Sequence, residues 1–271
     1  MSAVRTRRLE LMRPAEIVAA RAACPVAYLP VGPLEWHGPH LPLGVDPLVA
    51  HAVALGAAAL VGGLVMPPLY LGTDVVRSPE MLRSIGFEGH EHIVGMDFPG
   101  NSVRSLYADA DVFERTVRHY VELLARQEYR IIAIVNGHGG ENQIPALRAL
   151  EEMQVAPARV LYCQAWLDPE GLPEGQSGGG HADATETSLM MHLWPESVDL
   201  SALPPLPHPL RNVDWAIVDG PTFEGRPNET RTVEADPRRL SSSEAGEADL
   251  WAAAEHVAER VRRALAEAEG R

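Results

Sequence analysis

Short, continuous apolar runs recur along the chain and are separated by longer stretches with helical spacing. Runs of this length are typical of strands that are buried on both faces of a parallel sheet. The longer stretches carry apolar residues on one side and charged residues on the other, as amphipathic helices do. The expected strands are residues 25–31, 64–69, 130–135 and 159–164, and the expected helices are 47–61, 110–128, 143–154, 184–193 and 241–269.

The order of these elements predicts the fold class. Asp46 followed by Pro47 is a strong helix start, because aspartate caps helix N-termini and proline fits the first helical position. Strands and helices then alternate along the chain, which predicts an α/β fold, a three-layer α/β/α sandwich with a mostly parallel central sheet. No repeat or long polar linker divides the sequence, so we interpret residues 1–271 as a single domain.

Composition and charge exclude several classes of function. All 23 basic residues are Arg, and the absence of Lys rules out Schiff-base enzymes and nucleotide sites that use a lysine. The net charge of −14 argues against nucleic-acid or membrane-surface binding, because both need a dense basic patch. Cys24 and Cys163 lie in apolar runs and are predicted to be buried free thiols. With no signal-peptide pattern and no membrane-spanning run, we expect a cytoplasmic protein.

Polar residues gather in three glycine-rich clusters near predicted strand ends or helix starts. Ligand sites in open α/β sheets form at the carboxyl ends of strands, so we expect the clusters to meet. Imidazoles and carboxylates without thiolates are the ligand set of Zn²⁺, Mn²⁺ or Fe²⁺, and a carboxylate such as Asp46 can bridge two ions. The clusters contain Glu35, His37 and Asp46, then His138 and Glu141, and finally His181 and Glu186.

Each cluster also has a purely structural interpretation. Asp46 alone is most simply a helix cap, and His138 in a glycine-rich turn can serve only to hydrogen-bond the backbone. Glu186, one turn into a helix, can serve only the helix dipole. The coincidence of three such clusters is what favours a metal site.

The segment LPVGPLEWHGPHLPLGVD, the later run NGHGG and the GHA and ETS motifs resemble the creatininase (creatinine amidohydrolase) family. The likeness runs from about residue 23 to residue 193. It implies an α/β/α fold, two divalent metal ions per subunit (Zn, Mn or Fe) and a homo-oligomer, often a hexamer. A small-molecule amide is the implied substrate.

The resemblance also implies roles for individual residues. Glu141 matches either a displaced metal ligand or a general base, and His181 matches a histidine that contacts the substrate and moves protons. Trp36, Gly139 and Asn101 stand in motif positions from which we expect substrate contacts, although Trp36 can equally be a packed aromatic. The implied metal ligands are Glu35, His37, Asp46, His138 and Glu186, with Asp46 as the bridge.

Two departures separate the chain from creatininase in the narrow sense. Ser177 and Gly178 stand where creatininase carries a Trp–Asp pair, and Gly139 replaces its metal-loop tyrosine, so the residues that hold a flat creatinine ring are missing. We therefore expect hydrolysis of another non-peptide C–N amide bond, in a cyclic amide or a formamide. Arg77 and Arg104 are candidates for binding an acidic substrate group.

Two alternatives stay open on the sequence. One is a peptidase like the mycofactocin-maturation member of the family, which acts on a modified peptide. The other is a degenerate, non-catalytic metal-binding member. The intact Glu35, His37, Asp46 and His138 weigh against the second alternative.

Overall fold

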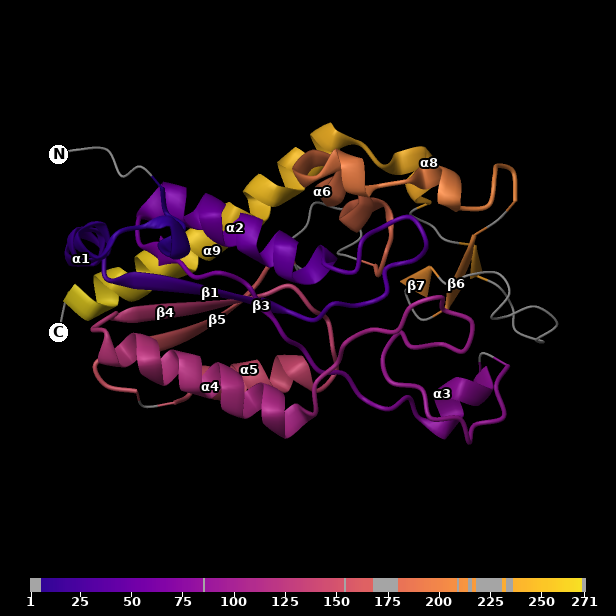
Figure 1. Cartoon of the computed structure of the whole chain (residues 1–271), viewed down its shortest axis with the longest axis horizontal. Coiled ribbons are helices and arrows are strands. Elements are labelled where there is room, and N and C mark those ends of the chain that lie inside the picture. The colour runs from indigo at the N-terminus through magenta and orange to yellow at the C-terminus, as the bar shows by residue number, and fades with distance from the viewer. Residues whose placement is uncertain are drawn as a thin grey trace.

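A parallel sheet lies between two layers of helices in the computed structural model (Figure 1). The structure describes residues 6–84, 86–153, 155–167, 180–208, 210–213, 216–217, 231–232 and 236–269. The strand order is β2-β1-β4-β5, and β3 pairs with β1 beyond β2. All these pairings are parallel, so the predicted α/β/α sandwich with a parallel sheet is confirmed. The strands are β1 (Val26–Gly32), β2 (Leu64–Val65), β3 (Leu69–Tyr70), β4 (Ile131–Asn136) and β5 (Arg159–Gln164).

Helices α2, α6 and α9 contribute to the core on one face of the sheet, and α1, α4 and α5 to the core on the other (Figure 1). A small antiparallel sheet, β7-β6-β8, lies outside this sandwich. The helices are α1 (Pro14–Ala23), α2 (Val45–Val61), α3 (Pro79–Ser84), α4 (Ala110–Arg126), α5 (Gln143–Glu151), α6 (Ala184–Leu193), α8 (Pro237–Leu240) and α9 (Ser243–Glu269), with 3-10 turns at Leu9–Leu11, Pro195–Ser197 and Leu200–Ala202. The small strands are β6 (Arg211–Val213), β7 (Ala216–Ile217) and β8 (Arg231–Thr232).

The central strands are buried on both faces, as their continuous apolar sequences predict. In β1, Tyr28 packs into the core under α2 and α9, whereas its neighbours Ala27 and Leu29 pack into the core under α4. β4 alternates in the same way, with Ala133 on the α2 side and Ile134 on the α4 side. β1 ends at Gly32 and β4 at Asn136, and the site begins in the loops that follow these two strands.

Three local expectations differ in detail from the structure. The strand expected at 64–69 is divided into β2 and β3, because Pro67 and Pro68 lack the N–H groups that a continuous ladder needs. Helix α2 begins at Val45 after Gly44, and its N-terminus has no side-chain cap bond, so Asp46 is not the helix cap. Ser177 and Gly178 lie outside the described residues.

The C-terminal helix packs on the element that carries Glu186. Gly246 of α9 lies so close to α6 that a Cβ atom there would come within 2.8 Å of the backbone nitrogen of Leu189.

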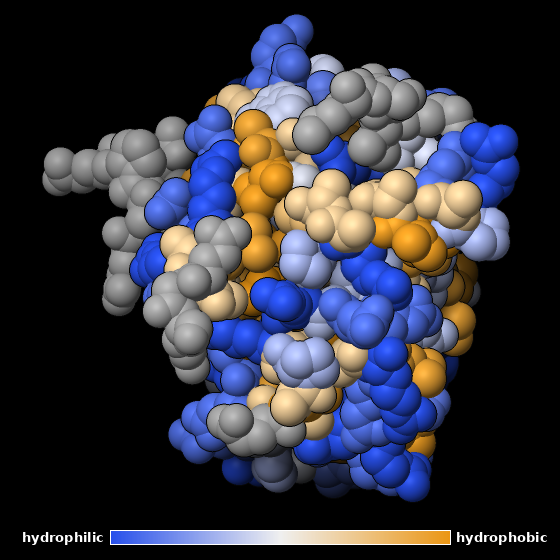
Figure 2. Space-filling view, turned by 90° about the vertical axis from the view of Figure 1, so that its left-hand side faces the viewer, coloured by the Kyte–Doolittle hydropathy of each residue, from blue (hydrophilic) through white to orange (hydrophobic). Residues whose placement is uncertain are grey.

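The C-terminal end of α9 and helix α1 lie at the left end of Figure 1, and Figure 2 shows hydrophilic residues interleaved with smaller hydrophobic patches on that face. Within the described residues, no helix has the length and apolarity that a membrane span requires.

Candidate metal centre

The loop after β1 brings Glu35 and His37 into the interior, where their side chains are 2 % and 0 % exposed. The backbone N–H of Glu35 donates to the carbonyl of Leu43 and closes this loop. The Nδ1 atom of His37 lies 3.0 Å from the carbonyl oxygen of Glu35, so it carries the proton, and Nε2 presents its lone pair to the cluster. Glu35 Oε2 lies 3.9 Å from that Nε2 atom, so the two side chains face the same space.

Asp46 lies between two histidines. Its Oδ1 atom is 3.0 Å from Nε2 of His37, and its Oδ2 atom is 3.0 Å from Nδ1 of His138. Because each carboxylate oxygen faces a different imidazole, the geometry is that of a carboxylate able to bridge two cations. A role as helix cap is therefore not what holds Asp46 in place.

His138 is held by a network of buried amides after β4. The side chain of Asn136 donates to the carbonyl of His138 at 2.7 Å and accepts from its N–H at 3.2 Å. Gln143 in turn donates to Asn136 Oδ1 at 2.7 Å and accepts from the backbone N–H of Thr73 at 2.8 Å. Asn136 is the first residue of the NGHGG run and Gln143 lies three residues after it, but nothing in the sequence pattern assigned either of them a role.

The third cluster comes from the start of α6. Asp183 caps this helix by accepting from the N–H groups of Thr185 and Glu186. Glu186 Oε1 then lies 3.6 Å from Nε2 of His37. His181 faces the carbonyl of Trp36 with Nε2, so that Nδ1 lies 3.7 Å from Glu35 Oε2.

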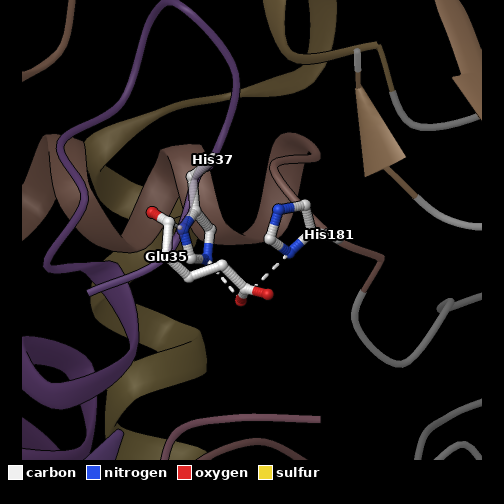
Figure 3. Close-up of side chains that lie close together, drawn as sticks. All are labelled: Glu35, His37 and His181. Carbon is white, nitrogen blue, oxygen red and sulfur yellow. Dashed lines mark hydrogen bonds and ion pairs between the residues drawn. The ribbon is translucent and has the colours of Figure 1, made fainter. Parts of the chain in front are cut away.

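The close-up of Glu35, His37 and His181 shows how the first and third clusters meet (Figure 3). The Glu35 carboxylate points toward both imidazoles, and the rings of His37 and His181 have centroids 4.2 Å apart. His181 lies on the segment before α6, whereas the other two lie on the loop after β1. Residues distant in sequence thus converge on one carboxylate.

Burial and the neighbouring charges shift the pKa values of the clustered side chains in opposite directions. Burial alone raises the pKa of Glu35, but the neighbouring His138 and His181 outweigh it and hold that pKa well below its ordinary value. Burial lowers the pKa of His138, but Glu35 and Asp46 outweigh this effect and raise it well above the ordinary value. The neighbouring histidines therefore stabilise the Glu35 carboxylate in its charged form, the form that binds cations.

The donor set fits divalent ions. Glu35, Asp46 and His138 form one group whose donor atoms lie within 4.8 Å of one another, and His37, Asp46 and Glu186 form a second. Glu35, His37 and His181 form a third group of the same kind. In the described part of the chain, no arginine pairs with these carboxylates, and Asp46 Oδ2 and the Nε2 atoms of His37 and His138 are buried without a hydrogen-bond partner. Buried charges of this kind need a cation beside them.

A cavity of about 710 Å³ opens onto the cluster. Glu141 is exposed on its wall and belongs to none of the three donor groups formed by the described residues. Arg77 lies on another wall, whereas Arg104 is exposed elsewhere. The remaining lining includes apolar side chains beside the polar cluster. Of the residues expected in the site, the lining contains Glu35, Asp46, His138, Gly139, Glu141, His181 and Glu186.

Trp36 and Asn101 are placed differently from the other expected substrate contacts. Trp36 is 6 % exposed and packs in a small apolar core with Phe87 and Phe98, which is the packed-aromatic alternative. Asn101 donates to the carbonyl of Met96 at 2.6 Å. Neither is among the described residues that line the cavity, although Glu35, next to Trp36, and Met96, bonded to Asn101, are.

Two further residues contact the cluster without having been identified in the sequence. The hydroxyl of Tyr107 donates to Oε1 of Glu35, and Asp74 Oδ2 lies 3.9 Å from Nε2 of His138. Burial and Glu35 raise the pKa of Tyr107, so the phenol stays protonated and can donate. Both residues lie in the segment between β3 and α4, outside its one helix, α3.

Comparison with known proteins gives a consistent result. The family model described as creatininase, creatinine amidohydrolase, matches residues 10–261. The chain is 31 % identical over 257 residues to creatinine amidohydrolase of Pseudomonas putida, covering 88 % of each chain. It is 32 % identical over 180 residues to the mycofactocin precursor peptide peptidase of Mycolicibacterium smegmatis, covering 64 % of this chain and 60 % of that protein. A solved structure of the Mn form of creatininase has a TM-score of 0.63 at 30 % identity, covering 95 % of this chain and 98 % of the other.

Proposed function

The chain belongs to the creatininase family of amidohydrolases, and on that premise we propose that it hydrolyses a non-peptide C–N amide bond, in a cyclic amide or a formamide, of a small molecule. The observation that carries the proposal is the convergence of three segments on Asp46. Glu35, Asp46 and His138 would hold one divalent ion, and His37, Asp46 and Glu186 a second. Zn²⁺, Mn²⁺ and Fe²⁺ all suit this oxygen and nitrogen donor set.

Glu141 and His181 have separate roles in proton transfer. Bound divalent ions supply Lewis acidity and a water of lowered pKa, and thus a nucleophile at neutral pH. Glu141 lines the cavity from the loop after β4 and takes a proton from the attacking water. His181 is oriented by the Trp36 carbonyl, which accepts from Nε2; once the ring also carries a proton on Nδ1, it delivers that proton to the leaving nitrogen, and the proton taken up by Glu141 restores it. The C–N bond breaks as the carbonyl carbon gains oxygen from water.

The cavity indicates a substrate larger than a single small ring. Its volume of about 710 Å³ lies in the range of pockets that bury drug-sized ligands. Arg77 on the wall offers a guanidinium to an acidic group of the substrate, and Met81 and Ile144 contact an apolar part. Gly139 leaves open space, with no atom within 4 Å of a Cβ built there.

The proposal is tested with the purified full-length protein. Metal content per chain is measured first, and then a panel of cyclic amides and formamides is screened with Zn²⁺ or Mn²⁺ added or removed by a chelator. We expect about two ions per chain and hydrolysis that the chelator abolishes and the ion restores. A protein that holds its ions and hydrolyses none of these compounds would contradict the assigned substrate class.

A peptidase is the second candidate function. The similarity to the mycofactocin precursor peptide peptidase and the size of the cavity favour it. Peptides with free and amidated C-termini distinguish the two functions, because a peptidase that uses Arg77 for the terminal carboxylate would cleave only the free form. Hydrolysis of peptides but not of cyclic amides would replace the first proposal with the second.

A further inference from the structure

Two side chains of the segment between β3 and α4 support the cluster from outside. Tyr107 donates its hydroxyl proton to Oε1 of Glu35, and Asp74 Oδ2 lies 3.9 Å from Nε2 of His138. We propose that Tyr107 and Asp74 are positioning residues of the metal centre, which decide that Glu35 presents Oε2 and His138 presents Nδ1 to an ion. This inference rests on the proposed function, because it concerns the same metal centre.

Tyr107 determines which oxygen of Glu35 is available. Its hydroxyl oxygen accepts from the backbone N–H of Met96 at 3.1 Å, which leaves the hydroxyl proton for Glu35. The other oxygen, Oε2, lies 3.2 Å from Nδ1 of His138. With Oε1 engaged by the phenol, Oε2 is the oxygen of Glu35 that would be left for an ion.

The Asp74 carboxylate lies behind the ring of His138 and, at 3.9 Å, favours the proton on Nε2 through its charge rather than through a hydrogen bond. Nδ1 of His138 faces Asp46 and Glu35, so an ion held by these three residues meets that nitrogen without its proton. The proton then lies on Nε2, which faces Asp74. A carboxylate behind a metal-binding imidazole fixes the tautomer and makes the ring a stronger ligand. Asp74 is itself held, because its Oδ1 atom accepts from the N–H of Val75 at 2.7 Å.

Both positioning groups lie against one backbone position. Gly95 has a φ of +50°, and a Cβ atom there would come within 2.7 Å of both Asp74 Oδ2 and the Cζ atom of Tyr107. Arg77 donates from Nε to the carbonyl of Gly95 and so ties this backbone to the cavity wall. The glycine therefore allows the phenol and the carboxylate to approach the cluster together.

The test compares Tyr107→Phe and Asp74→Asn with two matched controls. Tyr70→Phe removes the same atom from a half-exposed tyrosine of β3, and Asp97→Asn alters a carboxylate of the same segment that accepts from the N–H of Ser105. Affinity for Zn²⁺ is measured by competition with a chromophoric chelator, and the visible absorption spectrum is recorded with Co²⁺ bound. We expect Zn²⁺ affinity about 10- to 100-fold weaker in both test variants and unchanged in the controls. We also expect an altered Co²⁺ spectrum in Tyr107→Phe.

Wild-type affinity and an unchanged Co²⁺ spectrum in both variants would overturn the inference, as would an equal loss in the controls. A thermal melt of each protein without added metal shows whether it folds. If Tyr107→Phe does not fold, Gly95→Ala takes its place, because it displaces both side chains without removing either, and the expected loss of affinity is the same. A wild-type protein that binds no Zn²⁺ or Co²⁺ would overturn the metal centre of the proposed function itself, which is a distinct outcome.

Discussion

Gly137 lies so close to the main chain of Asp46 that a Cβ atom at position 137 would come within 2.6 Å of the carbonyl carbon of Asp46. The N–H of Gly137 also donates to the carbonyl of Val31 at 2.9 Å, at the end of β1. The loop after β4 and the start of α2 are therefore locked together. This contact keeps His138 and Asp46 at 3.0 Å although they belong to different motifs.

Replacement of Gly137 by alanine should force Asp46 and His138 apart. We expect a loss of stability of about 1–3 kcal/mol from overpacking. Zn²⁺ affinity should fall by at least about 10-fold, since both proposed ions share Asp46. Gly139→Ala is the matched control, because a Cβ atom there meets no atom within 4 Å. Chemical unfolding and Zn²⁺ titration check both variants, and equal behaviour of the two would show that the close contact has no such effect.

Replacement of Asp46 by alanine should remove metal and activity together. Asp46 is the one side chain common to the first two donor groups, so we expect both ions to be lost and kcat to fall by about 10³-fold or more. Elemental analysis and the amide hydrolysis assay measure these effects. Full activity in a metal-free Asp46→Ala protein would rule out the dinuclear centre.

Glu186 and Glu141 should respond differently to conversion into glutamine. Glu186→Gln should lower the metal content to about one ion per chain, because Glu186 belongs to the donor group of His37 and Asp46. Glu141→Gln should keep the metal content and lower kcat by about 10²–10⁴-fold, as expected for a general base. Elemental analysis and steady-state kinetics on the two proteins check this. If Glu141→Gln lost metal and Glu186→Gln retained it, Glu141 would be the metal ligand in place of Glu186.

His51 should make stability depend on pH. Burial, followed by the nearby Arg8, lowers the pKa of this histidine in the folded protein. At this position the unfolded chain therefore binds more protons than the folded one below about pH 6.5, and the contribution of His51 to the free energy of unfolding decreases as the pH falls from 7 to 5. His51→Gln should show a smaller decrease over that range in urea unfolding. The exposed His119→Gln variant should keep the wild-type slope, and an equal change in both variants would contradict the explanation.

The sequence is sufficient for the parts of the fold that local patterns determine. β1, β4 and β5 lie within one residue of their expected positions, because continuous apolar runs mark strands that are buried on both faces. The same holds for α6, and this helix places Glu186 beside His37. The clusters at 35–46, 138–141 and 181–186 were expected to meet because parallel strands end at the same edge of a sheet.

Other parts of the site depend on tertiary contacts that no local pattern reveals. Tyr107 and Asp74 lie in an irregular segment, and only the folded chain shows that they face Glu35 and His138. Both Glu141 and Glu186 are candidate metal ligands on the sequence, and only the course of the loop after β4 shows that Glu186, not Glu141, lies beside His37. Trp36 lies between Glu35 and His37 in the sequence, yet its side chain packs away from them in a separate apolar core.

The packing of Gly246 on α6 gives the last helix of the chain an influence on the chemistry of the first motif. Helix α9 supplies no side chain to the described lining of the cavity, but it forms the surface on which Glu186 is held in register with His37. The motif at residues 29–46 therefore depends on the rest of the fold and would not form the same centre in another scaffold. Shortening or remodelling the C-terminal helix would shift Glu186 relative to His37 and so alter the centre, although no residue of the centre itself would be changed.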